Sequence, residues 1–151
     1  MSKILFSGFK LGQIELKNRV VMSPMTRNRC LGNLPAENVT QYYAQRAEAG
    51  LIISEGIAPS PNGLGYARIP GLFNVDQANA WKKVTDAVHA AGGKIFAQLM
   101  HTGRVGHPMN MPNRARVLAP SAVTMTGQVY IDHLGPQPYP APQEMSEVEI
   151  Q

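Results

Sequence analysis

One stretch, residues 92–107 with the sequence GGKIFAQLMHTGRVGH, constrains the fold of this chain more than any other. Glycine adopts positive φ without steric penalty, so the pair Gly92-Gly93 is expected to end a preceding helix. The apolar residues 95–97 then predict a buried strand. Hydrogen-bonding side chains follow this strand at Gln98, His101, Thr102, Arg104 and His107. Parallel α/β sheets bind ligands beyond the carboxyl ends of their strands, so the stretch predicts a ligand site at its exit.

The same order of strand, polar residues and helix occurs earlier in the chain. Residues 9–16 alternate apolar and polar side chains around a glycine, which predicts a small hairpin. Residues 19–22 (RVVM) predict a first buried strand, which ends in SPMTR at 23–27. A helix is expected over residues 36–49, because its apolar positions recur at helical spacing and Gly50 follows.

A second unit follows this helix. Residues 51–53 (LII) predict the second strand, which is expected to end before the polar residues 54–56. Residues 59–71 are rich in Gly and Pro and predict a long loop. The next helix is expected to have Asn74 as its N-cap and Gln77 at N3. Its predicted apolar stripe consists of Trp81, Val84, Val88 and Ala91.

The third strand precedes a long section with weak periodicity, residues 102–143. Short strands are expected at residues 117–118 and 128–131, and the section as a whole predicts an inserted lid. Ser146 and Glu149 then form the pattern of a capping box, which announces a helix. Because one turn of helix is not stable alone, we expect the chain to be part of a longer one, cut at this helix.

The repeated order of strand and helix predicts an α/β fold built from right-handed βα units. Such units form either an open doubly wound sheet or a closed (β/α)₈ TIM barrel. The dinucleotide fingerprint GxGxxG follows none of the strands, because Gly63 and Gly65 have no third glycine at the required spacing. Its absence favours the barrel, of which this chain would supply the first three βα units.

Composition and charge exclude several other classes. The chain of 151 residues has 44% hydrophobic and 16% charged residues, which is typical of a folded domain. The net charge is +4, but the Lys and Arg residues are scattered along the chain, which argues against nucleic acid as a partner. The apolar runs are too short for a membrane span or a secretory signal. The lone Cys30 forms no intramolecular disulfide, so a cytoplasmic location is expected. His101 and His107 lack a third metal ligand at the usual spacing, so no metal site is expected.

Five segments together resemble the Old Yellow Enzyme family of FMN-dependent ene reductases. They cover nearly the whole chain in the family's order, which makes the resemblance more specific than any single motif. The segments are SPMTR at 23–27, YYAQRAEAGLIISEG at 42–56, GYARIPGL at 65–72, WKKVTDAVHAAGGKIFAQLMHTGR at 81–104 and LAPSAV at 118–123.

The resemblance implies a TIM barrel with non-covalent FMN across its carboxyl-terminal mouth. In this family a hydride passes from NAD(P)H to the flavin and then to the C=C bond of an α,β-unsaturated carbonyl compound. By motif, Pro24 and Met25 would line the flavin through their backbone, and Thr26 would bond the flavin C4 carbonyl and tune the flavin. Gly56 would let the isoalloxazine approach the backbone, and Gln98 would bond the pyrimidine edge.

Side-chain chemistry supports the roles of Thr26 and Gln98 independently of the resemblance. A threonine hydroxyl and a carboxamide donate hydrogen bonds without bringing a charge into the site, which suits an electron-rich ring. Tyr66 lies in the loop that the family uses at the substrate mouth. Met100 stands where many relatives carry tryptophan. The thinner, flexible methionine side chain would either widen the substrate pocket or simply pack against its neighbours.

Other parts of such an enzyme are not expected in this chain. The family's substrate-anchoring His/Asn or His/His pair, its tyrosine proton donor and its FMN phosphate site follow the fourth strand or later. Residues 1–151 would thus be the N-terminal part of one flavin-binding barrel domain, with the C-terminal half supplied by a second chain. Two alternatives remain open: a non-catalytic half-barrel, or a related flavin barrel acting on dienoyl thioesters or amines.

Overall fold

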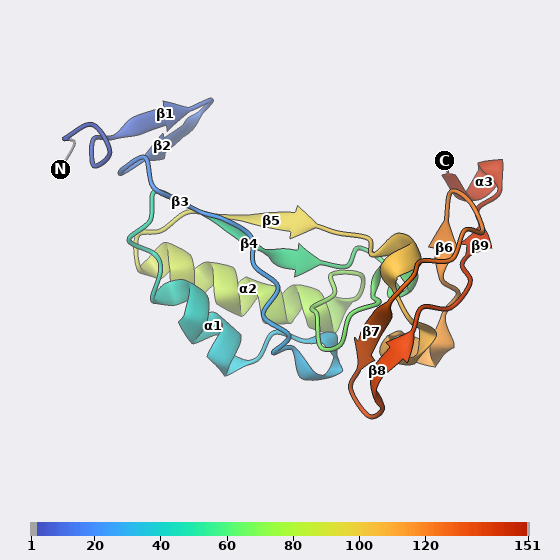
Figure 1. Ribbon diagram of the computed structural model, residues 1–151. Coiled ribbons are helices and arrows are strands. Elements are labelled where there is room, and N and C mark those ends of the chain that lie inside the picture. Colours follow the sequence, from blue (N-terminus) through green and yellow to red (C-terminus); the bar gives the residue numbers. More distant parts are fainter. Residues whose placement is uncertain (1–2, 151) are drawn as a thin grey trace.

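A three-stranded parallel sheet organises the computed structural model, which describes residues 3–150 (Figure 1). Its strand order is β3-β4-β5. Val21 pairs with Leu51, and Ile52 pairs with Ile95, so the three strands run side by side in one direction. The strands are β3 (Val21–Met22), β4 (Leu51–Ile57) and β5 (Ile95–Leu99).

Strand β4 is longer than the sequence predicts. The polar residues Ser54, Glu55 and Gly56, expected beyond its end, lie inside the strand and are buried. The pairing with β5 shifts register between Ile53 and Gly56, which marks a β-bulge. The prediction of an early exit was therefore wrong, because hydrogen bonds within the fold satisfy these polar groups and let the strand continue.

Strand β5 is also longer than expected. The prediction that it is buried was wrong, because several of its side chains are exposed. Side chains alternate between the two faces of a strand, so Phe96 and Gln98 share one face and Ile95 points to the other. Ile95 packs against the helix-covered core, whereas Phe96 is 42% exposed. Phe96 is exposed because β5 is an edge strand and its face opposite the helices has no covering layer (Figure 1).

Two helices, α1 (Glu37–Ala44) and α2 (Val75–Ala90), cover one face of the sheet (Figure 1). Helix α1 ends five residues earlier than predicted. Beyond Ala44 the backbone changes to i→i+3 hydrogen bonds, as in Ala47 N–H to Ala44 O at 3.1 Å, which tightens the chain into turns. Ala47 still packs in the core at 3% exposure, so the predicted apolar spacing continues past the helix.

The N-terminus of α2 follows the predicted capping pattern. The Gln77 N–H donates to Asn74 Oδ1 at 2.9 Å, and the Gln77 side chain accepts from the Phe73 N–H at 2.9 Å. Both interactions satisfy backbone donors near the helix start. At the other end Ala91 is the C-cap and is exposed, so it does not belong to the apolar stripe as predicted.

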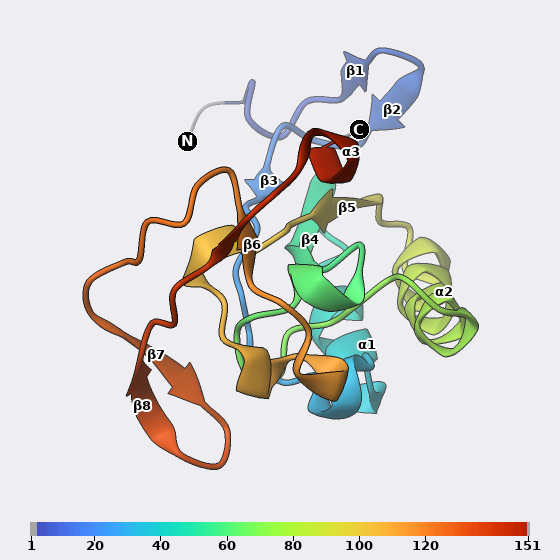
Figure 2. The ribbon, with the colours of Figure 1, turned by 90° about the vertical axis from the view of Figure 1, so that its right-hand side faces the viewer.

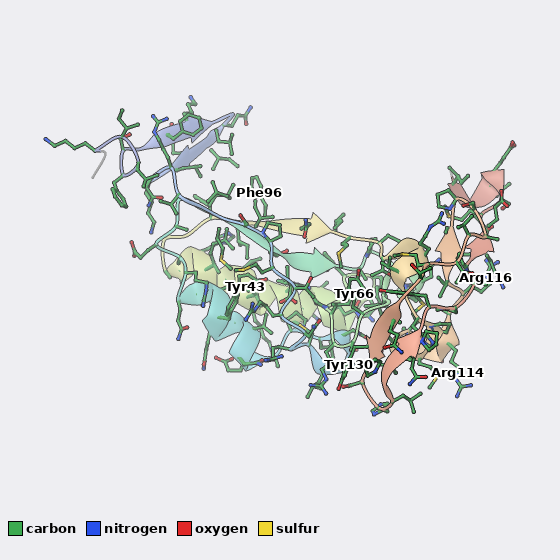
Figure 3. The ribbon with its side chains drawn as sticks, in the orientation of Figure 1. Tyr43, Tyr66, Phe96, Arg114, Arg116 and Tyr130 are labelled. Atoms are coloured by element: carbon green, nitrogen blue, oxygen red, sulfur yellow. The ribbon has the colours of Figure 1, made fainter. Side chains whose placement is uncertain are left out.

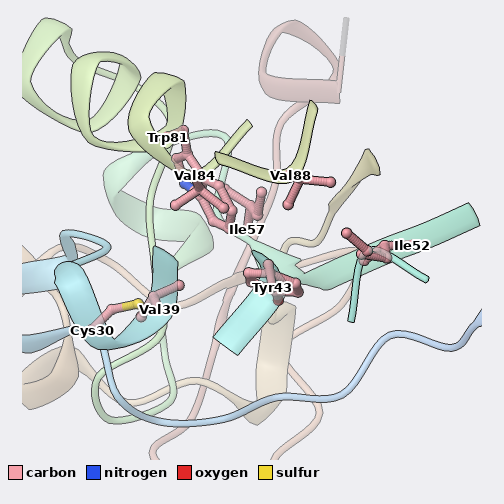
Figure 4. Close-up of a cluster of buried hydrophobic side chains, with 9 residues drawn as sticks. Cys30, Val39, Tyr43, Ile52, Ile57, Trp81, Val84 and Val88 are labelled. Carbon is pink, nitrogen blue, oxygen red and sulfur yellow. The ribbon is translucent and has the colours of Figure 1, made fainter. Parts of the chain in front are cut away.

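The main core lies between the helices and the sheet (Figure 4). Tyr43 packs against Trp81 with ring centroids 6.2 Å apart, and the Trp81 indole N–H donates to the Gly71 carbonyl at 3.2 Å. The predicted stripe of α2 supplies Val84 and Val88, both fully buried. The core also contains Cys30, Val39, Ala47, Ile52 and Ile57.

The predicted hairpin at the start of the chain is confirmed. Strands β1 (Phe9–Leu11) and β2 (Ile14–Leu16) pair antiparallel, with Phe9 opposite Leu16. The hairpin lies at the amino ends of the sheet strands, away from the predicted ligand site (Figure 1).

The section after β5 forms a lid at the carboxyl ends of the sheet strands (Figures 1 and 2). It contains β6 (Leu118–Ala119), β7 (Gln128–Ile131), β8 (Gly135–Pro138) and β9 (Gln143–Glu144). Strand β7 matches the prediction, and β6 lies one residue beyond the predicted 117–118. Strand β8 has no strand signal in the sequence because it contains two prolines, and β9 has none because it is two residues long and pairs with the distant β6. Short 3₁₀ turns lie at Leu31–Asn33, Pro61–Gly63, Gly103–Val105, Pro108–Asn110 and Pro112–Arg114.

The last element that the structure describes is α3 (Glu147–Ile150), which begins where the capping box predicts. The Glu149 carboxylate accepts from the Ser146 N–H at 2.9 Å. This contact and the Arg116 guanidinium lower the pKa of Glu149 to about 2.

Across residues 3–150, no helix combines the length and the apolar character needed to cross a membrane.

Candidate functional site

The ends of the three sheet strands bring the predicted flavin-contact residues to one edge. Gly56 of β4 pairs directly with Gln98 of β5. The segment after β3 runs alongside β4, because the Arg27 N–H donates to Glu55 Oε2 at 3.2 Å. Thr26, Gly56 and Gln98 therefore lie on neighbouring backbone segments at the carboxyl edge of the sheet.

The segment 23–27 presents its side chains to solvent. Pro24, Met25 and Thr26 are all exposed, with Met25 at 45%. Within residues 3–150, the Thr26 hydroxyl makes no hydrogen bond to another residue, so it does not cap or brace the loop. Its donor and acceptor capacity is available to a ligand.

The sequence predicted Gln98 beyond the end of the third strand. This was wrong, because Gln98 lies inside β5. Its backbone N–H donates to Ser54 Oγ at 3.0 Å, which anchors the strand at the bulge. Its half-buried side chain is on the same face as Phe96, opposite the helices. The carboxamide makes no hydrogen bond to any residue that the structure describes, so it too is free for a ligand.

Gly56 and Met100 are brought into contact. A Cβ at Gly56 would lie 2.6 Å from the Met100 sulfur, so the thioether occupies the space that a side chain at Gly56 would take. A side chain at position 56 would thus displace the flexible end of Met100. Close approach of an isoalloxazine to Gly56 stays a prediction.

A pocket of about 310 Å³ lies between the segment after β3 and the lid. Tyr66 lines it from the long loop after β4, and Tyr130 lines it from β7 of the lid (Figure 3). Burial raises the pKa of Tyr66, so its hydroxyl stays protonated and can donate. Thr26 and Tyr66 line this same pocket, whereas Met100 does not. The other lining residues are Asn28, Ala67 and Val129.

Sequence reasoning gave no role to the two residues that connect these segments. Ser54 and Glu55 are each 1% exposed, and both make hydrogen bonds to other strand ends. The signal in the sequence was a carboxylate within an apolar strand segment, since a buried Glu requires specific partners.

The polar residues after β5 hold local structure. His101 Nδ1 accepts from the Gly103 N–H at 3.0 Å, and Arg104 donates to the Val123 carbonyl at 2.8 Å and to Ser121 Oγ at 2.9 Å. His101 and Arg104 thus hold the backbone and side chains of the loops after β5 in place. In the part of the chain that the structure describes, no three His, Cys, Asp or Glu side chains gather where they could hold a metal ion.

Cys30 is fully buried in the core, and burial raises the pKa of its thiol to about 12. A thiol with this pKa is protonated at neutral pH and is a poor nucleophile. Cys30 therefore packs as a small apolar side chain.

Comparison with known proteins gives a consistent assignment. The sequence model of the NADH:flavin oxidoreductase / NADH oxidase family matches residues 4–151. The chain is 40% identical over 149 residues to 12-oxophytodienoate reductase 7 of Oryza sativa subsp. japonica, covering 97% of this chain and 38% of that protein.

Solved structures with the same fold include morphinone reductase in complex with tetrahydroNAD, with a TM-score of 0.90 and 40% identity, covering 99% of this chain and 42% of that one. They also include the Old Yellow Enzyme homologue from Zymomonas mobilis, with a TM-score of 0.91 and 41% identity, covering 97% of this chain and 41% of that one. The predicted fold class is confirmed: β3, β4 and β5 are strands of a TIM barrel. The chain spans about two fifths of the relatives that it matches.

Proposed function

Because the chain belongs to the NADH:flavin oxidoreductase / NADH oxidase family, we propose that it forms the N-terminal part of an FMN-dependent ene reductase. The complete enzyme would use NAD(P)H to reduce the C=C bond of α,β-unsaturated carbonyl compounds. One observation carries the proposal: Thr26, Gly56 and Gln98 lie on three neighbouring backbone segments at the carboxyl edge of a parallel sheet. This edge is where TIM barrels place their active sites.

The donor set at this edge fits a flavin ring. Thr26 and Gln98 offer a hydroxyl and a carboxamide that are not used within the described fold, and neither brings a charge. Hydrogen bonds from such neutral donors stabilise electron density on a reduced ring. Pro24 and Met25 would contribute backbone contacts beside Thr26. The bound FMN would supply the redox chemistry, carrying a hydride from NAD(P)H to the β-carbon of the alkene.

The substrate would enter the pocket between the long loop and the lid. Tyr66 lines this pocket with a protonated hydroxyl, which can donate to a carbonyl oxygen. Met100 would border the site through its packing on Gly56, and its unbranched thioether would adapt to different alkenes.

A second polypeptide would complete the barrel. Strand β5 ends the described sheet on one side, and Phe96 and Leu99 on it are 42% and 62% exposed. A parallel edge strand with exposed apolar side chains calls for a further strand. A C-terminal half of the same enzyme fits this requirement, because relatives continue for more than half their length beyond the region matched. Cys30 is the single cysteine of the sequence and gives no sign of a disulfide framework, so we propose a cytoplasmic location.

The test is reconstitution of this chain with a second chain that carries the remaining barrel strands. We expect retained yellow flavin absorbance and consumption of NADPH with a cyclic enone. A colourless complex would overturn the proposal and favour a non-catalytic half-barrel. Turnover of dienoyl thioesters or amines without turnover of enones would assign the chain to a different branch of flavin barrels.

Two variants test the site within that complex. Replacing Thr26→Val or Gln98→Leu removes one donor, which should weaken FMN binding about 2- to 10-fold. Thr124→Val is the matched control, because Thr124 is exposed on the lid outside the pocket. Equal FMN affinity in all four proteins would show that Thr26 and Gln98 do not contact the flavin.

A further inference from the structure

The bulge in β4 is the point where the three segments of the site meet. Ser54 and Glu55 form this bulge, in the middle of an otherwise apolar strand, and both are 1% exposed. A buried carboxyl group is costly unless it has specific hydrogen-bond partners. The hydrogen-bond partners of Glu55 therefore identify which segments of the fold this residue connects.

Two of these partners come from segments on either side of the strand. Glu55 Oε2 accepts from the backbone N–H of Arg27 at 3.2 Å, and Arg27 directly follows Thr26. The Glu55 N–H donates to the Tyr43 hydroxyl oxygen at 2.7 Å, and that hydroxyl donates to Glu55 Oε1 at 3.5 Å. Glu55 thus links the loop after β3 to helix α1.

Its neighbour makes the corresponding link to β5. Ser54 Oγ accepts from the Gln98 N–H at 3.0 Å and donates to the Glu55 carbonyl at 2.8 Å. The backbone of Gln98 and the backbone beside Thr26 are therefore both fixed by adjacent residues of one bulge. Gly56, which directly follows them, is held in register by the same contacts.

We infer that Glu55 is a positioning residue, which holds the loop carrying Thr26 through the Arg27 backbone N–H and so sets Thr26 relative to Gln98. This inference rests on the proposed function in one respect, that Thr26 and Gln98 contact the flavin. The positioning itself is a property of the chain alone.

Glu55 holds Arg27 through the hydrogen bond from the Arg27 backbone N–H, the backbone clamp, and not through an ion pair. The Arg27 guanidinium lies over the Tyr42 ring, 5.3 Å from its centroid, and makes no salt bridge to Glu55 within the described residues. The other titratable groups that face Glu55 are Tyr43 and Cys30, and Arg29 lines the pocket of about 160 Å³ beside it. Burial dominates these influences and raises the pKa of Glu55. Either protonation state keeps an oxygen that can accept from Arg27.

Amide hydrogen exchange of Arg27 in the 151-residue chain tests the clamp without flavin. Glu55→Met keeps similar volume but has no acceptor oxygen, whereas Glu55→Gln keeps a carbonyl oxygen. Losing a hydrogen bond of about 1.4 kcal/mol corresponds to about tenfold faster exchange in Glu55→Met, and Glu55→Gln should restore protection. Glu15→Ala, an exposed position on the hairpin, is the control for loss of a carboxylate.

Unchanged Arg27 exchange in Glu55→Met would overturn the inference, as would equal loss of protection in Glu55→Gln. A second measurement does not depend on any variant folding. In the unsubstituted chain, the Arg27 amide proton shift should follow the titration of the Glu55 carboxyl with the same midpoint. An Arg27 shift that ignores the titration of Glu55 would equally overturn the clamp.

The reconstituted complex then tests the consequence for the site. FMN should bind about tenfold more weakly to the complex with Glu55→Met and with nearly normal affinity to that with Glu55→Gln. If the unsubstituted complex binds no FMN, the proposed function fails while the Arg27 exchange still decides the clamp. If FMN binds equally to both variants, Glu55 does not position the flavin contacts.

Discussion

The Met100 sulfur lies over Gly56, within 2.6 Å of where a Cβ would stand. The Gly56→Ala substitution therefore forces the thioether to move, and because this is the flexible end of a half-buried side chain it should cost at most about 1 kcal/mol in the free energy of unfolding. Shortening the opposing side chain in Gly56→Ala/Met100→Ala should recover part of this loss, measurable as a coupling energy in a double-mutant cycle by urea unfolding. Gly8→Ala is the control, because its nearest contact would be an ordinary 3.5 Å. Strictly additive effects would exclude the contact.

Asn110 ties the lid to the loop that carries Tyr66. Its Nδ2 donates to the Gly65 carbonyl at 3.1 Å and to the Tyr130 carbonyl at 2.8 Å. Asn110→Ala should loosen the hairpin formed by β7 and β8, raising its amide exchange about tenfold while leaving that of α2 unchanged. Asn79→Ala, which removes an exposed amide from α2 and not from the lid, is expected to have no such effect on β7. Uniform change across the whole chain would contradict a local tie.

The cap of α2 gives a stability prediction that was visible in the sequence. Replacing Asn74→Ala removes the oxygen that accepts from the Gln77 N–H, which should lower the free energy of unfolding by about 1 kcal/mol. Asn79→Ala, exposed within the same helix, should be neutral or slightly stabilising because alanine is the better helix former. Thermal melting followed by far-ultraviolet circular dichroism compares the two, and equal melting temperatures would contradict the cap.

The indole of Trp81 combines burial with a hydrogen bond to Gly71. Trp81→Phe should destabilise the chain by about 1–3 kcal/mol, because it leaves the Gly71 carbonyl unsatisfied and a gap in the core. Phe96→Ala removes an exposed aromatic ring from the other face of the sheet and should change stability by less than about 0.5 kcal/mol. Chemical denaturation of both variants measures this contrast, which a loss of similar size in Phe96→Ala would refute.

The buried carboxyl of Glu55 predicts a pH dependence with a definite sign. Burial raises its folded-state pKa above 4.5, so the folded chain binds this proton more tightly than the unfolded chain. The stability contributed by this group is therefore present below pH 4.5 and is lost as pH rises through the folded pKa. Glu55→Gln removes this term, so the stability of the variant relative to the unsubstituted chain should rise with pH. Urea midpoints measured across this range check the sign, and a constant difference would contradict it.

Much of the fold was determined by the sequence alone. Hydrophobic period and helix capping are local properties, which neighbouring residues in the chain set among themselves. The hairpin at 9–16, the two helices with the Asn74 cap and the parallel order of three strands therefore follow from residue patterns. The resemblance to flavin-dependent reductases likewise rests on motifs that lie within the chain.

Tertiary structure alone decided the boundaries and the connections within the site. The sequence ended β4 at its first polar residue, but Tyr43, Arg27 and Gln98 come from segments distant in the chain and satisfy Ser54 and Glu55 inside the strand. The exposure of Phe96 likewise depends on which layer covers its face of the sheet. Residue patterns encode what a segment prefers, whereas burial and hydrogen-bond partners depend on which distant segments the fold brings together.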